Sequence, residues 1–95
     1  PASQKKFFVA STNDEMREKT SELAKQIRGL GLICDTDIMG RKFGKQIEYA
    51  DATGASYVII VGEKELAKGK IKLKDMKTGN ERDIDLDNLD ELGKL

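Results

Sequence analysis

Five consecutive apolar residues, Tyr57 to Val61, constrain the fold of this 95-residue chain more than any other feature. A strand with one face in water alternates apolar and polar side chains, whereas an unbroken run rich in β-branched residues is typical of a strand covered on both faces. Such a strand lies in the middle of a sheet that has helices on either side. The run therefore predicts an α/β domain, and the chain length allows a single core.

Two strand–helix units precede this run in the sequence. Residues 6–11 and 32–35 form short apolar segments that predict two further strands. Between them, apolar residues recur at helical spacing and predict a helix over about 13–30 with one buried face. Because Thr12-Asn13-Asp14-Glu15 matches a capping box, we expect the side chains of Thr12 and Glu15 to bind free amides at the helix start.

A second helix and a hairpin complete the pattern. Apolar residues at helical spacing predict a helix that begins near Gly40 and is closed by Gly54. Residues 70–74 and 83–86 alternate apolar and charged side chains, which predicts two half-buried antiparallel strands joined around residues 78–80. Leucines near the end of the chain then predict a short closing helix.

The predicted order is therefore βαβαβ followed by a β-hairpin and a C-terminal helix. We expect a three-layer α/β/α fold in which helices cover a mixed five-stranded sheet. Residues 1–95 are expected to form one domain. Because the chain begins with Pro1 rather than methionine, we expect it to be an excised piece of a longer chain.

Composition argues against several kinds of enzyme site. The chain has no histidine and a single cysteine, Cys34, so histidine-dependent triads, imidazole metal sites, internal disulfides and cysteine-based metal sites are excluded. The apolar neighbours of Cys34 favour a buried structural thiol over a nucleophile. Without a recognisable signal peptide or an apolar segment of membrane length, we expect a reducing, cytoplasmic setting and no membrane contact.

Charge is balanced overall but distributed unevenly. The 17 basic and 17 acidic residues give a net charge of zero, which does not by itself indicate a nucleic-acid-binding protein. Residues 41–77 nevertheless carry nine basic and five acidic side chains, whereas residues 80–95 carry two and six. This segregation is compatible with one positive face, and equally with a solvated surface on which folding interleaves the charges.

The basic segment GRKFGKQ, Gly40 to Gln46, lies at the predicted start of the second helix. Free amides, the helix dipole and cationic side chains converge there, an arrangement that suits a phosphate or a polar base. Three residues separate its glycines and Gln46 follows Lys45, so it differs from a P-loop and nucleotide hydrolysis is disfavoured. The alternative is an exposed helix start whose charges only keep the chain soluble.

Two later segments also offer ligand contacts. Glu65 follows the central strand, where loops at the carboxyl ends of parallel strands commonly bind ligands, and its carboxylate could accept hydrogen bonds from an exocyclic amine. The residues alone favour a simpler explanation, an acidic first turn of a short helix. Lys70, Lys72 and Lys74 share one strand face at intervals of about 7 Å, which suits a phosphate backbone. A lysine-protected edge strand explains them equally well.

Together, the order of elements and these motifs resemble the anticodon-binding domain at the C-terminal end of class II aminoacyl-tRNA synthetases, most closely that of histidyl-tRNA synthetases. The resemblance rests on GRKFGKQIEYADATGA and YVIIVGEKELAKGKIKLKDMKTGNE and extends from about Lys6 to Leu92. It implies a non-catalytic C-terminal piece of a histidine–tRNA ligase that binds the anticodon loop of histidine tRNA. No cofactor is expected in this chain, since ATP and magnesium would belong to a separate catalytic domain. The implied parent is a cytoplasmic homodimer.

The resemblance also implies which side chains contact tRNA. Carried over by position, they are Arg41, Lys42, Lys45, Gln46, Glu65 and Lys74. The lysines are expected to hold phosphates, while Gln46 and Glu65 are expected to read unstacked bases. Since Tyr49 and Tyr57 are the only tyrosines, base stacking is expected either to contribute little or to use Arg41.

Two other functions stay open on the sequence alone. A regulatory or accessory protein could use the same domain for RNA sensing or subunit contact, without ligase activity in its parent. A free-standing α/β domain could instead bind a small anionic ligand at residues 40–44. Class II catalytic motifs in the upstream sequence would distinguish the ligase from the first alternative.

Overall fold

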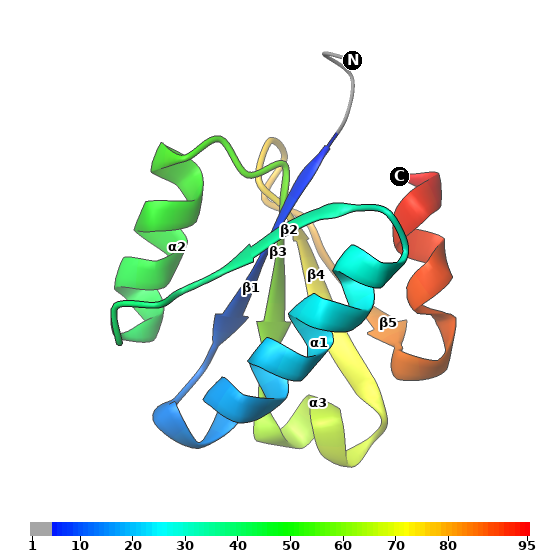
Figure 1. The fold of residues 1–95 in the computed structure, drawn as a ribbon, viewed down its shortest axis with the longest axis horizontal. Coiled ribbons are helices and arrows are strands. Elements are labelled where there is room, and N and C mark those ends of the chain that lie inside the picture. Colours follow the sequence, from blue (N-terminus) through cyan, green and yellow to red (C-terminus); the bar gives the residue numbers. More distant parts are fainter. Residues whose placement is uncertain (1–4) are drawn as a thin grey trace.

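The computed structural model describes residues 5–95, so the expectation about Pro1 lies outside the described residues. The helices and strands follow the predicted order (Figure 1). A short helix follows the central strand, as the simpler explanation of Glu65 implies. The elements are β1 (Lys6–Ser11), η1 (Asp14–Met16), α1 (Arg17–Gly29), β2 (Ile33–Thr36), α2 (Phe43–Ala52), β3 (Tyr57–Val61), α3 (Glu63–Ala67), β4 (Lys70–Asp75), β5 (Glu81–Asp85) and η2 (Leu86–Lys94), where η denotes a 3-10 helix.

The strands form the predicted mixed five-stranded sheet, in the order β2-β1-β3-β4-β5. β1 pairs in parallel with both β2 and β3, whereas β4 is antiparallel to β3 and to β5. The apolar run that forms β3 is the middle strand, as its composition predicts. The β4–β5 pair is the predicted hairpin.

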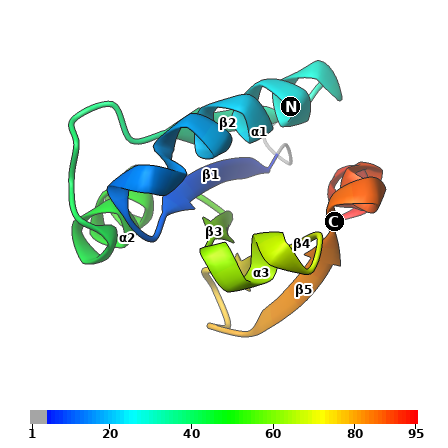
Figure 2. The ribbon, with the colours of Figure 1, turned by 90° about the horizontal axis from the view of Figure 1, so that it is seen from below.

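Helices cover both faces of the sheet, which confirms the three-layer arrangement (Figures 1 and 2). Neighbouring residues of β3 show why, because Val58 and Ile59 both have 0% exposure but belong to different apolar clusters. Ile59 packs in the larger cluster with side chains of α1 and η2. Val58 packs in the smaller cluster beneath α2, with Phe8 and Ala50.

On its side of the sheet, α2 packs against β1 and β3, and the flanking strands are less covered. The α2 cluster draws its buried strand residues from these two strands only. Asp35 of β2 and Lys70 of β4 keep side-chain exposures of 53% and 42%. Two parts of this face, one on β2 and one on the hairpin, are therefore open to a ligand.

The path of the chain creates a crevice where β1 and β3 end. From β1 the chain passes through α1 to β2 on one side, and then through α2 to β3 on the other. Ser11 and Val61 are paired at the ends of the two strands. In open α/β sheets, ligands bind outside the carboxyl ends of the strands at such a reversal of strand order. Figure 2 is viewed from below Figure 1, from the side of the molecule on which η1, the start of α2 and α3 lie.

The expected capping box at Thr12 to Glu15 is wrong. The Thr12 hydroxyl donates a hydrogen bond to the Val61 carbonyl at 3.1 Å, and the Thr12 amide donates to the same oxygen at 3.2 Å. The chain therefore continues along β3 before it turns, and the 3-10 turn η1 precedes α1. Asn13, at the N-cap of η1, makes no side-chain capping bond. The Thr12 hydroxyl therefore bonds to β3 and is not available for the helix cap that the local sequence pattern predicts.

Cys34 is the buried structural thiol that its neighbours predict. It is 3% exposed in the larger apolar cluster, and burial raises the pKa of its thiol to about 11.

We expect a thiol reagent at pH ~8 to modify Cys34 of the folded chain only as fast as the chain opens, because the thiolate is both scarce and inaccessible. Absorbance of released thionitrobenzoate with and without denaturant measures this. Fast, complete reaction of the folded chain would contradict the assignment.

Candidate functional site

A concavity of about 280 Å³ lies at the carboxyl ends of β1 and β3, and we call it the carboxyl-edge cleft. One side is formed by the end of β1 and the turn after it, and the other by the residues that lead into α2. Its lining comprises Ser11, Thr12, Asn13, Asp14, Arg17, Arg41, Lys42, Phe43 and Gln46. Three of the six residues expected to contact tRNA, Arg41, Lys42 and Gln46, thus lie together at the place where this fold binds ligands.

Gln46 joins α2 to the end of β1 and is 1% exposed. Its Oε1 accepts a hydrogen bond from the Ser11 amide at 2.9 Å, while its Nε2 donates to the carbonyl oxygens of Ser11 at 3.2 Å and Arg41 at 2.8 Å. Both amide hydrogens are therefore used within the fold. A side chain that reads bases must be reachable, so this geometry favours a positioning role for Gln46 over the expected base contact.

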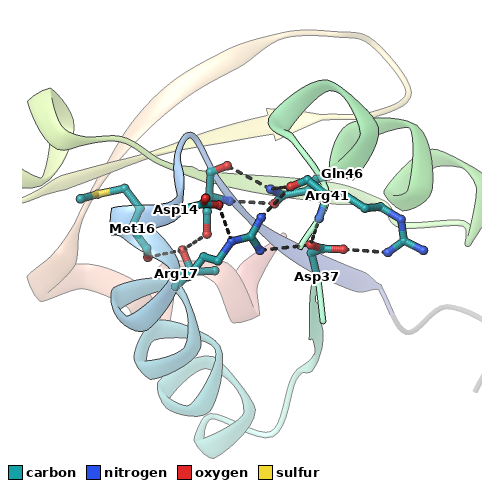
Figure 3. Close-up of polar contacts among 8 residues, drawn as sticks. Asp14, Met16, Arg17, Asp37, Arg41 and Gln46 are labelled. Carbon is teal, nitrogen blue, oxygen red and sulfur yellow. Dashed lines mark hydrogen bonds and ion pairs between the residues drawn. The ribbon is translucent and has the colours of Figure 1, made fainter. Parts of the chain in front are cut away.

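Asp37, in the loop between β2 and α2, binds two arginines beneath the surface (Figure 3). Its side chain is 1% exposed. One carboxylate oxygen accepts from the Arg41 guanidinium at 2.7 Å, and the other accepts from the Arg41 backbone amide at 2.7 Å and from Arg17 at 3.1 Å. Charge-assisted bonds of this kind are the strongest that side chains form. They fix the loop before α2 in one conformation.

The ionisation of this group follows from its contacts. Burial by itself would raise the pKa of Asp37, but the hydrogen bonds from Arg41 and Arg17 outweigh it and hold the pKa below its ordinary value. The pKa of Arg17 is raised, chiefly by its hydrogen bond to Asp14. Arg17 also donates to the Arg41 carbonyl at 2.7 Å, so it ties the start of α1 to the loop from a second direction.

The Arg41 side chain is held by Asp37 and by the Tyr49 ring and remains partly open to solvent. Its guanidinium carbon lies 4.3 Å from the centroid of the Tyr49 ring, a cation–π contact, and its side chain is 31% exposed. Tyr49 in turn packs edge-on against Phe8 of β1 at 5.9 Å. The result is a rigid, partly exposed cation on an aromatic support, which is a suitable surface for a planar ligand.

The remaining cations near α2 are free to reach a ligand. Lys42 is the N-cap residue of α2 and is exposed. Lys45, one turn along the helix, is 71% exposed, and among residues 5–95 its one ion pair is a surface pair with Glu48 at 3.4 Å. Such exposed pairs contribute little, so both ammonium groups are available to a phosphate.

Glu65 lies on α3, after the neighbouring strand β3. Its carboxylate folds back over Gly62, the N-cap residue of α3, and a Cβ atom at position 62 would lie 2.6 Å from Glu65 Oε1. Only glycine gives the carboxylate room for this position. Glu63 on the same turn accepts a hydrogen bond from Asn13 at 3.2 Å, which joins α3 to the rim of the carboxyl-edge cleft. Glu65 is thus at the same end of the sheet as Arg41, and the Asn13–Glu63 hydrogen bond lies between α3 and the cleft.

Lys74 lies away from these residues. It is paired with Val58, at the start of β3, whereas the cleft lies beyond Val61 at the other end. The lysine row also faces acidic residues, because Lys70, Lys72 and Lys74 are paired across the hairpin with Asp85, Asp83 and Glu81. Two ion pairs of 3.9 Å form between these rows. Folding therefore interleaves the basic middle of the chain with its acidic end.

Three residues of the site were not among those expected. Arg17, Asp37 and Tyr49 hold Arg41 in place. They lie on α1, on the loop between β2 and α2, and on α2. The Arg17–Asp37 contact spans 20 residues, so no local pattern indicates it. Within residues 5–95, no three acidic, cysteine or histidine side chains are grouped so as to hold a metal ion. In the same part of the chain no helix is both long and apolar enough to cross a membrane.

Comparison with known proteins agrees with this geometry. The sequence profile described as "Anticodon binding domain" matches residues 6–92, nearly the whole chain. The chain therefore belongs to the anticodon-binding domain family. The family was the one indicated by the sequence motifs, and its fold is the observed one.

The relatives that match are much longer proteins. A histidine–tRNA ligase of Methanocaldococcus jannaschii is 45% identical over 75 residues, which are 79% of this chain and 18% of the ligase. A histidine–tRNA ligase of Acetivibrio thermocellus is 37% identical over 83 residues, or 87% of this chain and 20% of the ligase. The crystal structure of apo S. aureus histidyl-tRNA synthetase superimposes with a TM-score of 0.85 at 33% identity, covering 97% of this chain and 24% of that one. This chain thus spans about a fifth of the curated relatives it matches.

We expect Asp37→Asn to destabilise the fold by about 1–3 kcal/mol, because two arginines lose a buried anionic partner. Since the pKa of Asp37 is lower in the folded chain, its contribution is complete above about pH 4 and is lost as the pH falls through the folded pKa. As the pH falls below about 4, the free energy of unfolding should therefore decrease less for the variant than for the wild-type chain. Urea unfolding at several pH values measures both effects. Parallel pH profiles for the two chains would contradict the assignment.

Proposed function

We propose that this chain is the C-terminal anticodon-binding domain of a histidine–tRNA ligase and that it binds the anticodon loop of histidine tRNA. The observation that carries the proposal is the similarity of nearly the whole chain to one part of histidine–tRNA ligases. The preorganised cations at the carboxyl edge support it, because an RNA loop needs phosphate contacts and reachable polar groups for unstacked bases.

In this proposal the expected contacts have distinct roles. Lys42 and Lys45 hold phosphates beside the start of α2, and Arg41 offers its guanidinium to a base or phosphate. Glu65 reads an exocyclic amine from the α3 side of the cleft. Gln46 acts from beneath by holding the Arg41 carbonyl. Lys74 is a more distant phosphate contact, reached by an RNA that extends across the open face of the hairpin.

In this proposal the aminoacylation reaction takes place in a part of the full-length ligase outside these 95 residues. We propose that a separate domain of the parent binds ATP and magnesium and joins histidine to the tRNA, while this domain selects the tRNA through its anticodon. A cytoplasmic, homodimeric parent is part of the same proposal. The similarity to histidine–tRNA ligases favours this reading over a borrowed domain in a regulatory protein.

Binding of anticodon stem-loops tests the proposal directly. We expect the histidine stem-loop to bind more tightly than loops with altered anticodons, by about tenfold for a base that loses a bidentate contact. Fluorescence anisotropy at fixed salt gives the affinities. Glu65→Ala should reduce this discrimination more than it reduces the affinity for the altered loops. Equal affinity of the wild-type chain for every loop would rule out anticodon recognition.

The positions of the lysines predict a graded salt dependence. Lys42→Ala should lower the slope of log affinity against log salt by about 0.7, the value for one phosphate contact on single-stranded RNA. Lys74→Ala should lower the slope less, because Lys74 lies at the opposite end of β3 from the cleft. Lys19→Ala, on α1 in an ion pair with Glu22, is the matched control and should leave the slope unchanged. If Lys74→Ala lowered the slope more than Lys42→Ala, the result would contradict binding at the cleft and would indicate that the RNA binds the hairpin.

A further inference from the structure

A second concavity, on the other side of Arg41, is not accounted for by these contacts. It has a volume of about 370 Å³, and we call it the β2 recess. Its lining comprises Arg28, Asp35, Thr36, Ile38, Met39, Arg41 and Tyr49. It lies on the part of β2 that α2 leaves uncovered. Arg41 lines both the β2 recess and the carboxyl-edge cleft, so a ligand in one is next to a ligand in the other.

Apolar side chains are unusually exposed around this recess. Within residues 5–95, the five large hydrophobic residues that are exposed all belong to residues 30–49. On the rim, Ile38 is 89% exposed and Met39 is 68% exposed, and Tyr49 on the wall is 40% exposed. Exposed apolar side chains that are grouped in one place often mark a binding surface, whereas singly scattered ones need no explanation.

The floor of the recess is polar, and this narrows the choice of ligand. The Asp35 carboxylate is 53% exposed and, within the described part of the chain, makes one ion pair, with Lys6 at 3.3 Å. An apolar protein segment laid over the rim would cover this charge without replacing its water. A nucleobase has the complementary shape, since its faces are apolar and planar while its edge carries amine and ring N–H donors.

We propose, resting on the proposed RNA-binding function, that the β2 recess binds one unstacked nucleobase bearing an exocyclic amine. The base packs against the Arg41–Tyr49 pair under Met39, and its amine donates to Asp35. Its phosphate lies toward Lys42, on the other side of Arg41. In this proposal Tyr49, Arg41 and the exposed rim together form the stacking surface for the base.

Methionine methyl groups give a direct test, because the chain contains only Met16, Met39 and Met76. We expect the Met39 methyl resonance of a ¹³C-methyl-methionine chain to move upfield when a histidine anticodon stem-loop is added, owing to the ring current of the bound base. Met16 packs against the larger apolar cluster and Met76 against the smaller, so they are internal controls. A Met39 signal that stays in place while the RNA binds would overturn the proposal.

Substitutions of Tyr49 separate stacking from electrostatics. Tyr49→Leu should weaken stem-loop binding about 5- to 100-fold, the range for loss of one base–aromatic contact, and leave the salt slope unchanged. Tyr49→Phe keeps the ring and should bind within about twofold of the wild type. If Tyr49→Leu unfolds, Met39→Ser on the exposed rim replaces it and should weaken binding in the same way. Full affinity in Tyr49→Leu or Met39→Ser would overturn the proposal.

The outcomes distinguish this inference from the function on which it rests. A chain that binds no stem-loop contradicts the proposed function itself. Anticodon-dependent binding with an unmoved Met39 contradicts the β2 recess alone. A Met39 shift that follows protein concentration in the absence of RNA would identify the rim as a protein interface and would also overturn the proposal. Asp35→Asn should reduce the preference for an amine-bearing base over uracil at one loop position; an unchanged preference would contradict the assigned role of Asp35.

Discussion

The buried Asp37 carboxylate is the contact on which the geometry of the carboxyl edge depends. It binds the Arg41 guanidinium, the Arg41 amide and Arg17 at the same time. The Arg41 carbonyl is then held from the other side by Arg17 and Gln46. A loop that would otherwise be free to move is thereby fixed by its backbone as well as its side chains. A ligand that meets this loop loses less free energy to ordering it, which is the benefit of preorganisation.

Most of the fold could be predicted because its strands and helices carry strong periodic patterns. The unbroken apolar run of β3 marks the middle of the sheet, and the alternation in β4 marks a strand with one open face. The helix start at Thr12 could not be predicted in the same way. Its local pattern matches a cap, but the partner that takes the hydroxyl is Val61, 49 residues away. Local signals fail where a long-range hydrogen bond competes for the same group.

The sequence indicated where the basic residues beside the cleft lie, but not which of their side chains the fold buries. The basic segment indicates where the loop before α2 lies, and Arg41 and Lys42 do lie at the cleft. Gln46 has the chemistry of a base reader, yet burial decides what it can reach, and burial depends on the packing of α2 on β1. The Tyr49 ring and Asp37 carboxylate matter because they touch Arg41, and such contacts follow only from the folded chain.

The hairpin has a consequence for how copies of this domain meet. β5 is an edge strand, and on its outward face it carries Glu81, Asp83 and Asp85. If two copies aligned their β5 strands antiparallel about Asp83, carboxylates would stand opposite carboxylates on that face. Like charges in that position destabilise strand pairing, and charged edges are a common protection against unwanted sheet extension. The same acidic residues that balance the lysines of β4 thus keep one edge of the sheet from joining its own copies.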